Sequence, residues 1–162
     1  MNSNDDSWLK QIPRDIGWYL SGFADGEGSF NVSLRKKDYG AGWQIAPSFN
    51  VSQRDRTVLA LYKRYLGCGT LRMRNDGVTY YEVQSIPVLC DRVIPFFIRF
   101  QLLAASKKTN FRIFREIVTM LAERRHETPE GLQKILELRE ELNMGRGRKR
   151  KYNIADVIDP RS

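Results

Sequence analysis

Strict alternation of apolar and polar residues in two neighbouring stretches most constrains how this chain can fold. Residues 30–37 and 43–53 each carry an apolar residue at nearly every second position, with polar residues between them. Such alternation is typical of a strand with one buried and one exposed face. The two stretches, joined by the turn KKDYGAG, predict a β-hairpin in which Pro47 is tolerated at an edge or a bulge.

A second hairpin follows the same pattern further along the chain. The segments TLRMRN and VTYYEVQS flank the dipeptide Asp76-Gly77, which is a strong turn signal between two strands. In this hairpin we expect Leu71 and Met73 to face the core.

Helices are predicted between and after the hairpins, because apolar residues there recur at helical spacing between residues that favour helix ends. The expected order is helix, hairpin, helix, hairpin and several helices. This order indicates an α+β domain with one antiparallel sheet covered by helices on one face. The helices are expected from Pro13 to a stop at Gly26 and Gly28, from a cap at Asp55 to Gly67, after Pro87 with an interruption at Pro95, from about Lys107 to Glu123, and from Thr128 and Pro129 to near Asn143.

The length of 162 residues suits a single domain. We expect that domain over residues 13–145, an N-terminal tail over residues 1–12 and a basic C-terminal tail over residues 146–162. The run GRGRKRKY near the end is expected to be extended or disordered until it meets a partner.

The composition excludes several classes of protein. Two cysteines and one histidine, Cys68, Cys90 and His126, cannot supply a disulfide framework or a complete structural zinc site. No apolar run is long enough for a membrane span, and the polar start does not resemble a signal peptide. We therefore expect an intracellular protein of a bacterial cytoplasm or of an organelle, either chloroplast or mitochondrion, with no membrane partner.

The positive charge points to a polyanionic partner. The chain has 27 Lys and Arg against 19 Asp and Glu, a formal charge of +8. On the predicted outward face of the two hairpins only Glu82 is acidic, whereas an ordinary solvated face usually mixes acids and bases. A two-stranded ribbon fits the major groove of DNA, where Arg pairs with guanine and Asn or Gln with adenine. The face comprises Asn31, Ser33, Arg35, Lys37, Gln44, Ser48, Asn50, Thr70, Arg72, Arg74, Tyr80, Glu82 and Gln84, and phosphate contacts are expected from Lys36, Arg54, Arg56, Lys63, Arg64 and the basic tail.

Two acids, Asp25 and Glu27, stand where the first helix is expected to end, although acids are disfavoured at a helix C-terminus. Beside a nucleic-acid surface, a carboxylate repels phosphate unless a divalent cation lies between them, and Mg²⁺ favours such oxygen ligands. The alternative is that both acids only cap and solubilise a turn. Small residues before them, Ser21, Gly22 and Ala24, would let two copies of this helix approach closely in a symmetric pair.

The segment LSGFADGEG, residues 20–28, resembles the signature of the LAGLIDADG homing endonucleases. The resemblance runs from about Ile16 to Tyr152, and only one copy of the signature is present. The further segments that are similar to blocks of this family, in the same order, are FNVSQRD (49–55), YLGCG (65–69), IPFFIRF (94–100), SKKTNF (106–111) and LNMGRGRKRKY (142–152).

The resemblance implies a saddle-shaped antiparallel sheet that grips the major groove, and signature helices that form the contact between two halves. It implies a homodimeric, site-specific enzyme of intron homing that makes a double-strand break in a long, roughly palindromic DNA site by metal-dependent hydrolysis. A non-cleaving intron RNA maturase, with intron RNA as partner, or a DNA-binding regulator on the same fold is the alternative. The helix contact is expected to involve Leu20, Ser21, Gly22, Phe23 and Ala24.

The resemblance also implies roles for individual residues in the active site. Glu27 would bind Mg²⁺, or another divalent cation such as Mn²⁺, together with the carbonyl of Gly26, whereas the acid two positions earlier would be structural. Gln53 would position water or metal, although it shares strand parity with core residues and is accessible only if the strand ends or bulges there. Lys107 would lie at the edge of the active site, with the adjacent Lys108 as the alternative.

Overall fold

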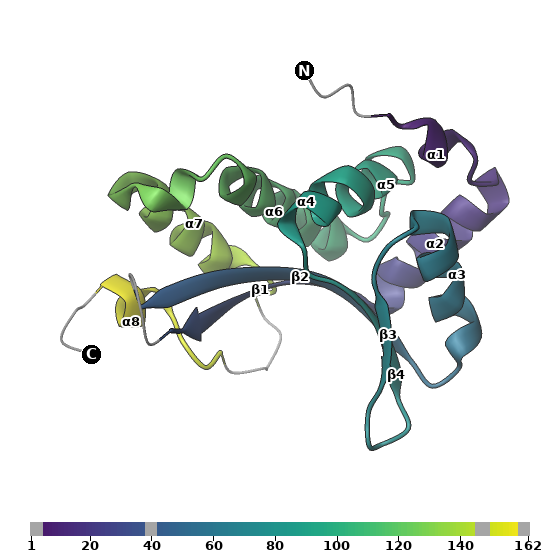
Figure 1. Ribbon diagram of the computed structural model, residues 1–162, viewed down its shortest axis with the longest axis horizontal. Helices are drawn as coiled ribbons and strands as arrows, with labels where there is room; N and C mark the ends of the chain where they lie inside the picture. The colour runs from purple at the N-terminus through teal and green to yellow at the C-terminus, as the bar shows by residue number, and fades with distance from the viewer. Residues whose placement is uncertain (1–4, 38–41, 145–149, 159–162) are drawn as a thin grey trace.

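The computed structural model describes residues 5–37, 42–144 and 150–158. It confirms the expected α+β architecture, with one four-stranded antiparallel sheet and helices packed on one of its faces, while the other face of the curved sheet stays open (Figure 1). The elements are α1 (Ser7–Lys10), α2 (Arg14–Glu27), β1 (Gly28–Lys36), β2 (Trp43–Gln53), α3 (Arg56–Leu66), β3 (Thr70–Met73), β4 (Thr79–Val83), α4 (Ile86–Val88), the π-helical turn η1 (Leu89–Val93), α5 (Ile94–Arg99), α6 (Ala105–Ala122), the 3₁₀ turn η2 (Arg125–Glu127), α7 (Pro129–Glu141) and α8 (Ile154–Ile158).

The strands lie in the order β1-β2-β4-β3, so that the two predicted hairpins join side by side through β2 and β4. Strand β2 pairs with β1 along nearly its whole length but with β4 only from Phe49 to Gln53. Pro47 pairs with Val32 of β1 and has no β4 residue opposite it. A proline fits there because its missing N–H costs no hydrogen bond on a locally open edge.

The helix caps also agree with the sequence. The side chain of Asp55 accepts a hydrogen bond from the backbone N–H of Thr57 at 2.8 Å and begins α3. Gly67 ends that helix in the left-handed conformation, with φ of 67°. Thr128 likewise accepts from the N–H of Gly131 at the start of α7.

The core lies between the sheet and the helices and is rich in aromatic rings. Phe30 of β1 is fully buried, and its ring centroid lies 5.2 to 5.5 Å from those of Phe49, Phe97, Phe111 and Phe114. These rings come from β1, β2, α5 and α6, so one cluster joins four elements. Truncating such a buried Phe to Ala typically costs about 3–5 kcal/mol.

Met73 does not face the core, contrary to expectation, since its side chain is 64% exposed. Leu71 does pack against the core. The difference arises because β3 is a four-residue edge strand, and Met73 pairs with Thr79 next to the turn, where the helices no longer cover the sheet. The turn itself is as predicted, with Gly77 at φ of 82°.

The first helix ends at Gly28, one of the two glycines expected to stop it. Gly26 lies within α2, which passes directly into β1 at Gly28 without a loop. Gly28 is in an ordinary extended conformation, with φ of −79°. A Cβ there would lie only 2.7 Å from the carbonyl oxygen of Ala24, so close packing rather than backbone freedom requires glycine.

Residues near both ends of the chain pack onto the domain. Leu9 and Ile12 are buried, although they fall in the segment expected to be a tail. The Arg99 guanidinium donates a hydrogen bond to the Leu9 carbonyl at 2.6 Å, and the Arg92 guanidinium lies 4.5 Å from the centroid of the Trp8 ring. The packed structure therefore includes part of residues 1–12.

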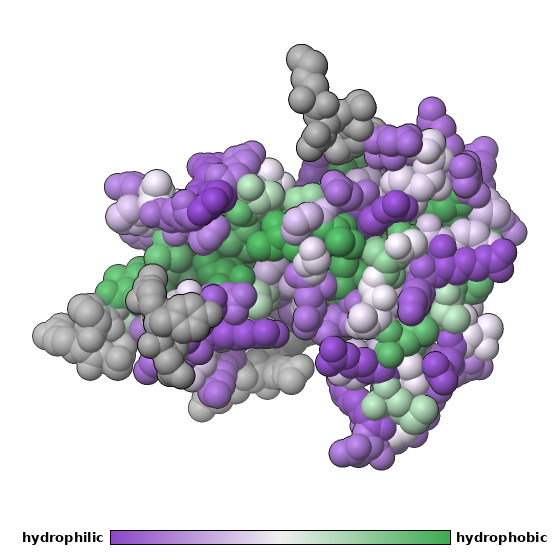
Figure 2. Space-filling model, viewed as in Figure 1, coloured by the Kyte–Doolittle hydropathy of each residue, from purple (hydrophilic) through white to green (hydrophobic). Residues whose placement is uncertain are grey.

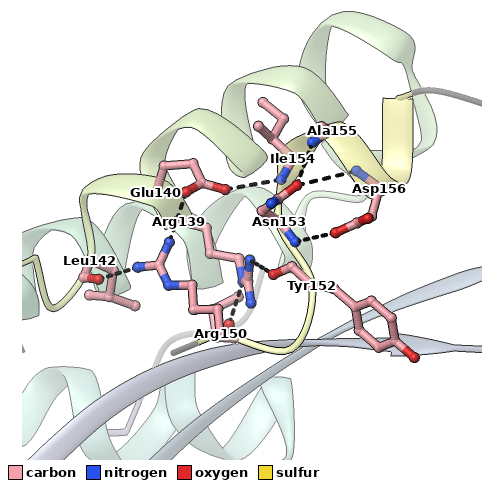
Figure 3. A network of polar contacts seen from close by, with 10 residues as sticks. Arg139, Glu140, Leu142, Arg150, Tyr152, Asn153, Ile154, Ala155 and Asp156 are labelled. Carbon is pink, nitrogen blue, oxygen red and sulfur yellow. Dashed lines mark hydrogen bonds and ion pairs between the residues drawn. The ribbon is translucent and has the colours of Figure 1, made fainter. Parts of the chain in front are cut away.

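At the other end, residues 150–158 contact α7 (Figure 3). The buried Arg139 donates to the carbonyls of Val32 and Tyr152, at 2.7 and 3.0 Å, and Arg150 forms an ion pair with Glu140. The basic run is expected to be extended or disordered until it meets a partner, but residues 150–152 pack on their own domain. They contact α7, and the centroid of the Tyr152 ring lies 4.9 Å from that of the Trp43 ring in β2. Residues 145–149 of that run lie outside the described residues.

Candidate active site and nucleic-acid interface

Asp25 has a structural partner in another helix. Its carboxylate accepts hydrogen bonds from the backbone N–H groups of Leu103, at 2.8 Å, and Ala104, at 3.2 and 3.3 Å. Ala104 is the residue that precedes α6, so Asp25 caps the N-terminus of that helix. An acid placed at the end of one helix is thus explained by the positive end of another.

Glu27 has no such explanation. It is the last residue of α2, its side chain is exposed, and within the described part of the chain its carboxylate forms no hydrogen bond or ion pair. Carbonyls in the last turn of a helix, including that of Gly26, lack an intrahelical donor. The structure therefore presents a carboxylate and a nearby carbonyl, both oxygen donors, at the junction of α2 and β1.

Lys107 lies at the same junction. It comes from the first turn of α6, is only 3% exposed, and its Nζ donates a hydrogen bond to the carbonyl of Gly28, the residue after Glu27. The neighbouring Lys108 is exposed and lies on a different side of the helix. Of the two lysines left open by the sequence, only Lys107 reaches the acidic end of α2 in this way.

Gln53 lies where β2 ends, and it is half-exposed rather than buried. Val51 pairs with Gly28, the first residue of β1, so Gln53 stands two residues beyond the start of the β1–β2 pairing, at the end of the sheet that carries Glu27. Its side-chain oxygen accepts the backbone N–H of Arg54 at 2.8 Å. The amide nitrogen is left to donate.

These donors fit a magnesium-like cation better than a softer metal. Mg²⁺ usually keeps several waters and takes only one or two protein carboxylates together with substrate phosphate oxygens. Among the described residues, no group of three or more His, Cys, Asp or Glu side chains could hold a metal ion. One exposed carboxylate with an adjacent carbonyl suits a cation shared with a bound phosphate, and it does not suit a closed structural site.

The predicted helix contact needs a correction. Leu20, Ser21 and Ala24 are at most 2% exposed and face the domain's own core, so their side chains are not available to a partner. Ser21 donates to the carbonyl of Phe100 at 2.7 Å. Gly22 is exposed and Phe23 is partly buried, so only these two of the five predicted contact residues reach the surface of α2.

The exposed side of α2 carries apolar and small residues instead. Trp18 and Tyr19 are 46% and 53% exposed, and a Cβ at Gly22 or Gly26 would meet no atom within 4 Å. The nearby Leu103, held through its N–H by the end of α2, is 78% exposed. The prediction of all five residues was wrong because consecutive residues point to different sides of a helix, and the sequence alone does not show which side packs against the core.

The open face of the sheet is as the sequence predicts. The buried residues of β1, β2 and β4 point to the helices, and the polar residues between them point away from the helices. Figure 2 shows the molecule hollowed on this side, with hydrophilic residues at both edges of the hollow. Of the thirteen predicted face residues, Lys37, Arg74 and Gln84 lie one position beyond the ends of β1, β3 and β4, and the others lie within the strands.

The strand register orders this face into rows. Ser29, Asn50, Glu82 and Thr70 lie side by side across all four strands. Ser29, Ala46 and Ser52 share the face but were not in the predicted set, although strand parity alone would have placed them there. Arg74 stacks over the Tyr80 ring at 5.1 Å, and the Arg54 side chain donates to the carbonyl of Asp76 at 3.2 Å, which links the end of β2 to the second turn.

The residues expected to contact phosphate are on the surface. Lys36, Arg54, Arg56, Lys63 and Arg64 are all exposed, at the end of β1, directly after β2 and along α3. No helix in the described ranges is long and apolar enough to cross a membrane.

Fold and site together define an α+β protein with an open, cationic sheet face and an acidic centre at one end of it. A family model described as LAGLIDADG endonuclease matches residues 20–118, from the middle of α2 through most of α6. The chain therefore belongs to the LAGLIDADG endonuclease family, as the signature indicated.

Individual relatives agree with this assignment. The chain is 34% identical over 145 residues to a probable intron-encoded endonuclease 2 of Neurospora crassa, and 35% identical over 106 residues to the homing endonuclease I-ApeII of Aeropyrum pernix. It covers 32% and 62% of the length of these two proteins, with 86% and 64% of its own residues matched. Among solved structures, the archaeal intron-encoded homing endonuclease I-Vdi141I complexed with DNA matches with a TM-score of 0.79 and 30% identity, over 87% of this chain and 91% of that one.

Proposed function

We propose that this protein is a homodimeric, site-specific DNA endonuclease that hydrolyses both strands of a long, roughly palindromic site with a divalent cation, Mg²⁺ or Mn²⁺. The observation that carries the proposal is the contrast between the two acids at the end of α2. Asp25 accepts hydrogen bonds from the backbone at the start of α6. Glu27 is exposed, has no partner in the described structure, and lies next to the cationic sheet face. Family membership and relatives named as homing endonucleases support it.

Binding of DNA would use the whole open face. Exposed Arg and amide side chains of the two hairpins suit base edges in the major groove, and exposed cations at the rims suit phosphates. Phosphate contacts dominate the salt dependence of such binding. The duplex would then lie along the sheet with its backbone over the end that carries Glu27.

Each residue of the site has a distinct task in this proposal. The Glu27 carboxylate and the Gly26 carbonyl would hold the cation, and a bound divalent cation would lower the pKa of a water molecule and stabilise charge on the phosphate. Gln53, with its oxygen engaged by Arg54, would donate from its amide nitrogen to a water or a phosphate oxygen. The buried Lys107 would place a fixed positive charge beside the scissile phosphate.

A second copy of the chain would complete the site. Cutting two strands needs an acidic centre for each, and each chain would supply one, at Glu27. The exposed side of α2 offers Gly22 and Gly26, four residues apart on one helix, where a second helix backbone could approach closely. A symmetric pair would bring the two Glu27 side chains to the middle of the duplex.

The cleavage test compares Glu27→Gln with Glu123→Gln, which makes the same chemical change on an exposed residue at the end of α6. Random duplexes would be incubated with each protein, with and without Mg²⁺, and cleaved ends captured and sequenced. We expect discrete, Mg²⁺-dependent cuts from the parent and from Glu123→Gln, and binding without cutting from Glu27→Gln. Equal cutting by Glu27→Gln would refute the assigned role, and binding of folded RNA in preference to all duplexes would favour the maturase alternative.

The dimer test compares Gly22→Leu with Ala60→Leu. Both place a bulky side chain on an exposed helix position, and Gly22 has open space around its Cβ, so the monomer should still fold. Sedimentation velocity should show a dimer for the parent and for Ala60→Leu, and a monomer for Gly22→Leu. A dimer of unchanged stability in Gly22→Leu would place the contact elsewhere.

A further inference from the structure

Glu82 is negatively charged on a surface whose other named residues are neutral or positively charged. It is in β4, on the open face of the sheet, and it is the one acid among the thirteen outward positions named above. The register places it in the middle of a row, with Asn50 of β2 on one side and Thr70 of β3 on the other. An acid in the middle of a surface that would meet a polyanion needs a specific reason.

The side chain is set into the face rather than extended from its rim. Glu82 is half-buried, and together with Gln84 it lines one wall of a hollow of about 400 Å³. Arg35, Gln44 and Ser48, from the β1–β2 hairpin, line the opposite part. The hollow therefore brings acceptor and donor side chains of both hairpins to one place on the open face.

No cation of the described residues forms an ion pair with Glu82. Within residues 5–37, 42–144 and 150–158 its carboxylate forms neither a hydrogen bond nor an ion pair. Facing a phosphate, it would only repel, because a carboxylate has acceptor oxygens and no donor. A DNA-bound Glu82 therefore needs a neutral hydrogen-bond donor, and in the major groove the only base donors are the amino groups of cytosine and adenine.

The chemistry of the groove separates these two bases. The adenine amino group lies beside N7, an acceptor, which favours a side chain with both a donor and an acceptor, such as Asn or Gln. The cytosine amino group has no acceptor of its own base beside it, and Glu or Asp accepts from it. The exposed acceptors of guanine and thymine would repel the carboxylate.

We propose, on the basis of the proposed DNA-binding function, that Glu82 is a specificity-determining residue that accepts a hydrogen bond from the amino group of one cytosine. In a symmetric dimer the preference occurs once in each half of the site. The carboxylate raises selectivity rather than affinity, because it rejects the other bases at that position and weakens binding to non-cognate DNA.

A binding selection tests this without requiring cleavage. Randomised duplexes are bound without divalent cation, retained duplexes are sequenced, and base preferences of the parent, Glu82→Gln, Arg72→Ala and Glu123→Gln are compared. Glu82→Gln keeps the shape of the side chain but supplies a donor. We expect cytosine at one column per half-site in the parent, favoured by about 10- to 100-fold, a shift towards adenine in that column alone for Glu82→Gln, and no change for Glu123→Gln.

Three results would overturn the inference. The first is an identical set of preferences for the parent and Glu82→Gln. The second is tighter binding of every sequence by Glu82→Gln with no column changed, which would make Glu82 a bulk charge. The third is a change in the same column as in Arg72→Ala, which would mean that Glu82 only orients that arginine, a diagonal neighbour on the sheet. Absence of any selected motif in all four proteins would instead contradict the proposed function itself.

Discussion

Removing the carboxylate of Asp25 should destabilise the fold, whereas removing that of Glu27 should not. The two acids are two residues apart at the same helix end, but within the described part of the chain only Asp25 forms hydrogen bonds to other residues. It accepts N–H groups of Leu103 and Ala104 at the start of α6, an 18-residue helix. The pair therefore separates a structural carboxylate from a functional one within a single turn.

The magnitude follows from the helix cap. Loss of a capping side chain costs about 0.5–2 kcal/mol, and loss of an anion at a helix N-terminus about 0.3–1 kcal/mol. Since Asp25 is partly exposed, we expect about 2 kcal/mol for Asp25→Ala and about 1 kcal/mol for Asp25→Asn, which keeps one acceptor. In Glu27→Gln an anion leaves a helix C-terminus, so the free energy of unfolding should stay the same or rise by a few tenths of a kcal/mol, roughly.

Equilibrium unfolding in urea, followed by fluorescence of the three tryptophans, measures these differences. The midpoint should fall for Asp25→Ala with an unchanged denaturant dependence, which would show that stability and not compactness has changed. Cleavage should show the reverse order, with complete loss in Glu27→Gln and partial loss in Asp25→Asn. Equal stability of Asp25→Ala and Glu27→Gln would refute the division of roles.

Other expected outcomes concern packing, pH and readout. Gly131→Ala should lower the melting temperature by about 4 to 8 °C, because a Cβ there would lie 1.8 Å from the Arg125 carbonyl oxygen; an unchanged value would show that this turn relaxes freely. Burial raises the pKa of Tyr62 and Tyr81 above the ordinary value of 10.0. Only the unfolded chain then ionises these phenols near pH 10. The free energy of unfolding should therefore stay constant below pH 10 and fall above it, and tyrosinate absorbance should rise as the chain unfolds. Arg72→Ala should relax preference at one base by about 1–3 kcal/mol in a competition assay, and a uniform loss over all sequences would make it a phosphate contact.

Much of the fold was predictable because its signals are local. Alternation assigned each strand residue to one of two faces, and a period of two leaves no other choice once one face is apolar. Asp55 and Gly67 marked the ends of α3 through their own backbone chemistry. The signature itself indicated the family. These properties depend on residues within a few positions of one another.

What the sequence left open depends on neighbours that are distant along the chain. The two acids look alike in sequence, and only the approach of α6, about 80 residues later, separates the capping Asp25 from the exposed Glu27. The same approach places Lys107, and not Lys108, at the end of α2.

The sequence alone determined the class of protein, the polarity of the open face and the residues that could form a site. Only the tertiary structure decided which side of α2 is exposed, since Leu20, Ser21 and Ala24 are buried in the core. It also decided where along β3 the helices stop covering the sheet. The physical reason is that local periodicity relates side chains to their own helix or strand, whereas burial and hydrogen bonding depend on which other element packs against it.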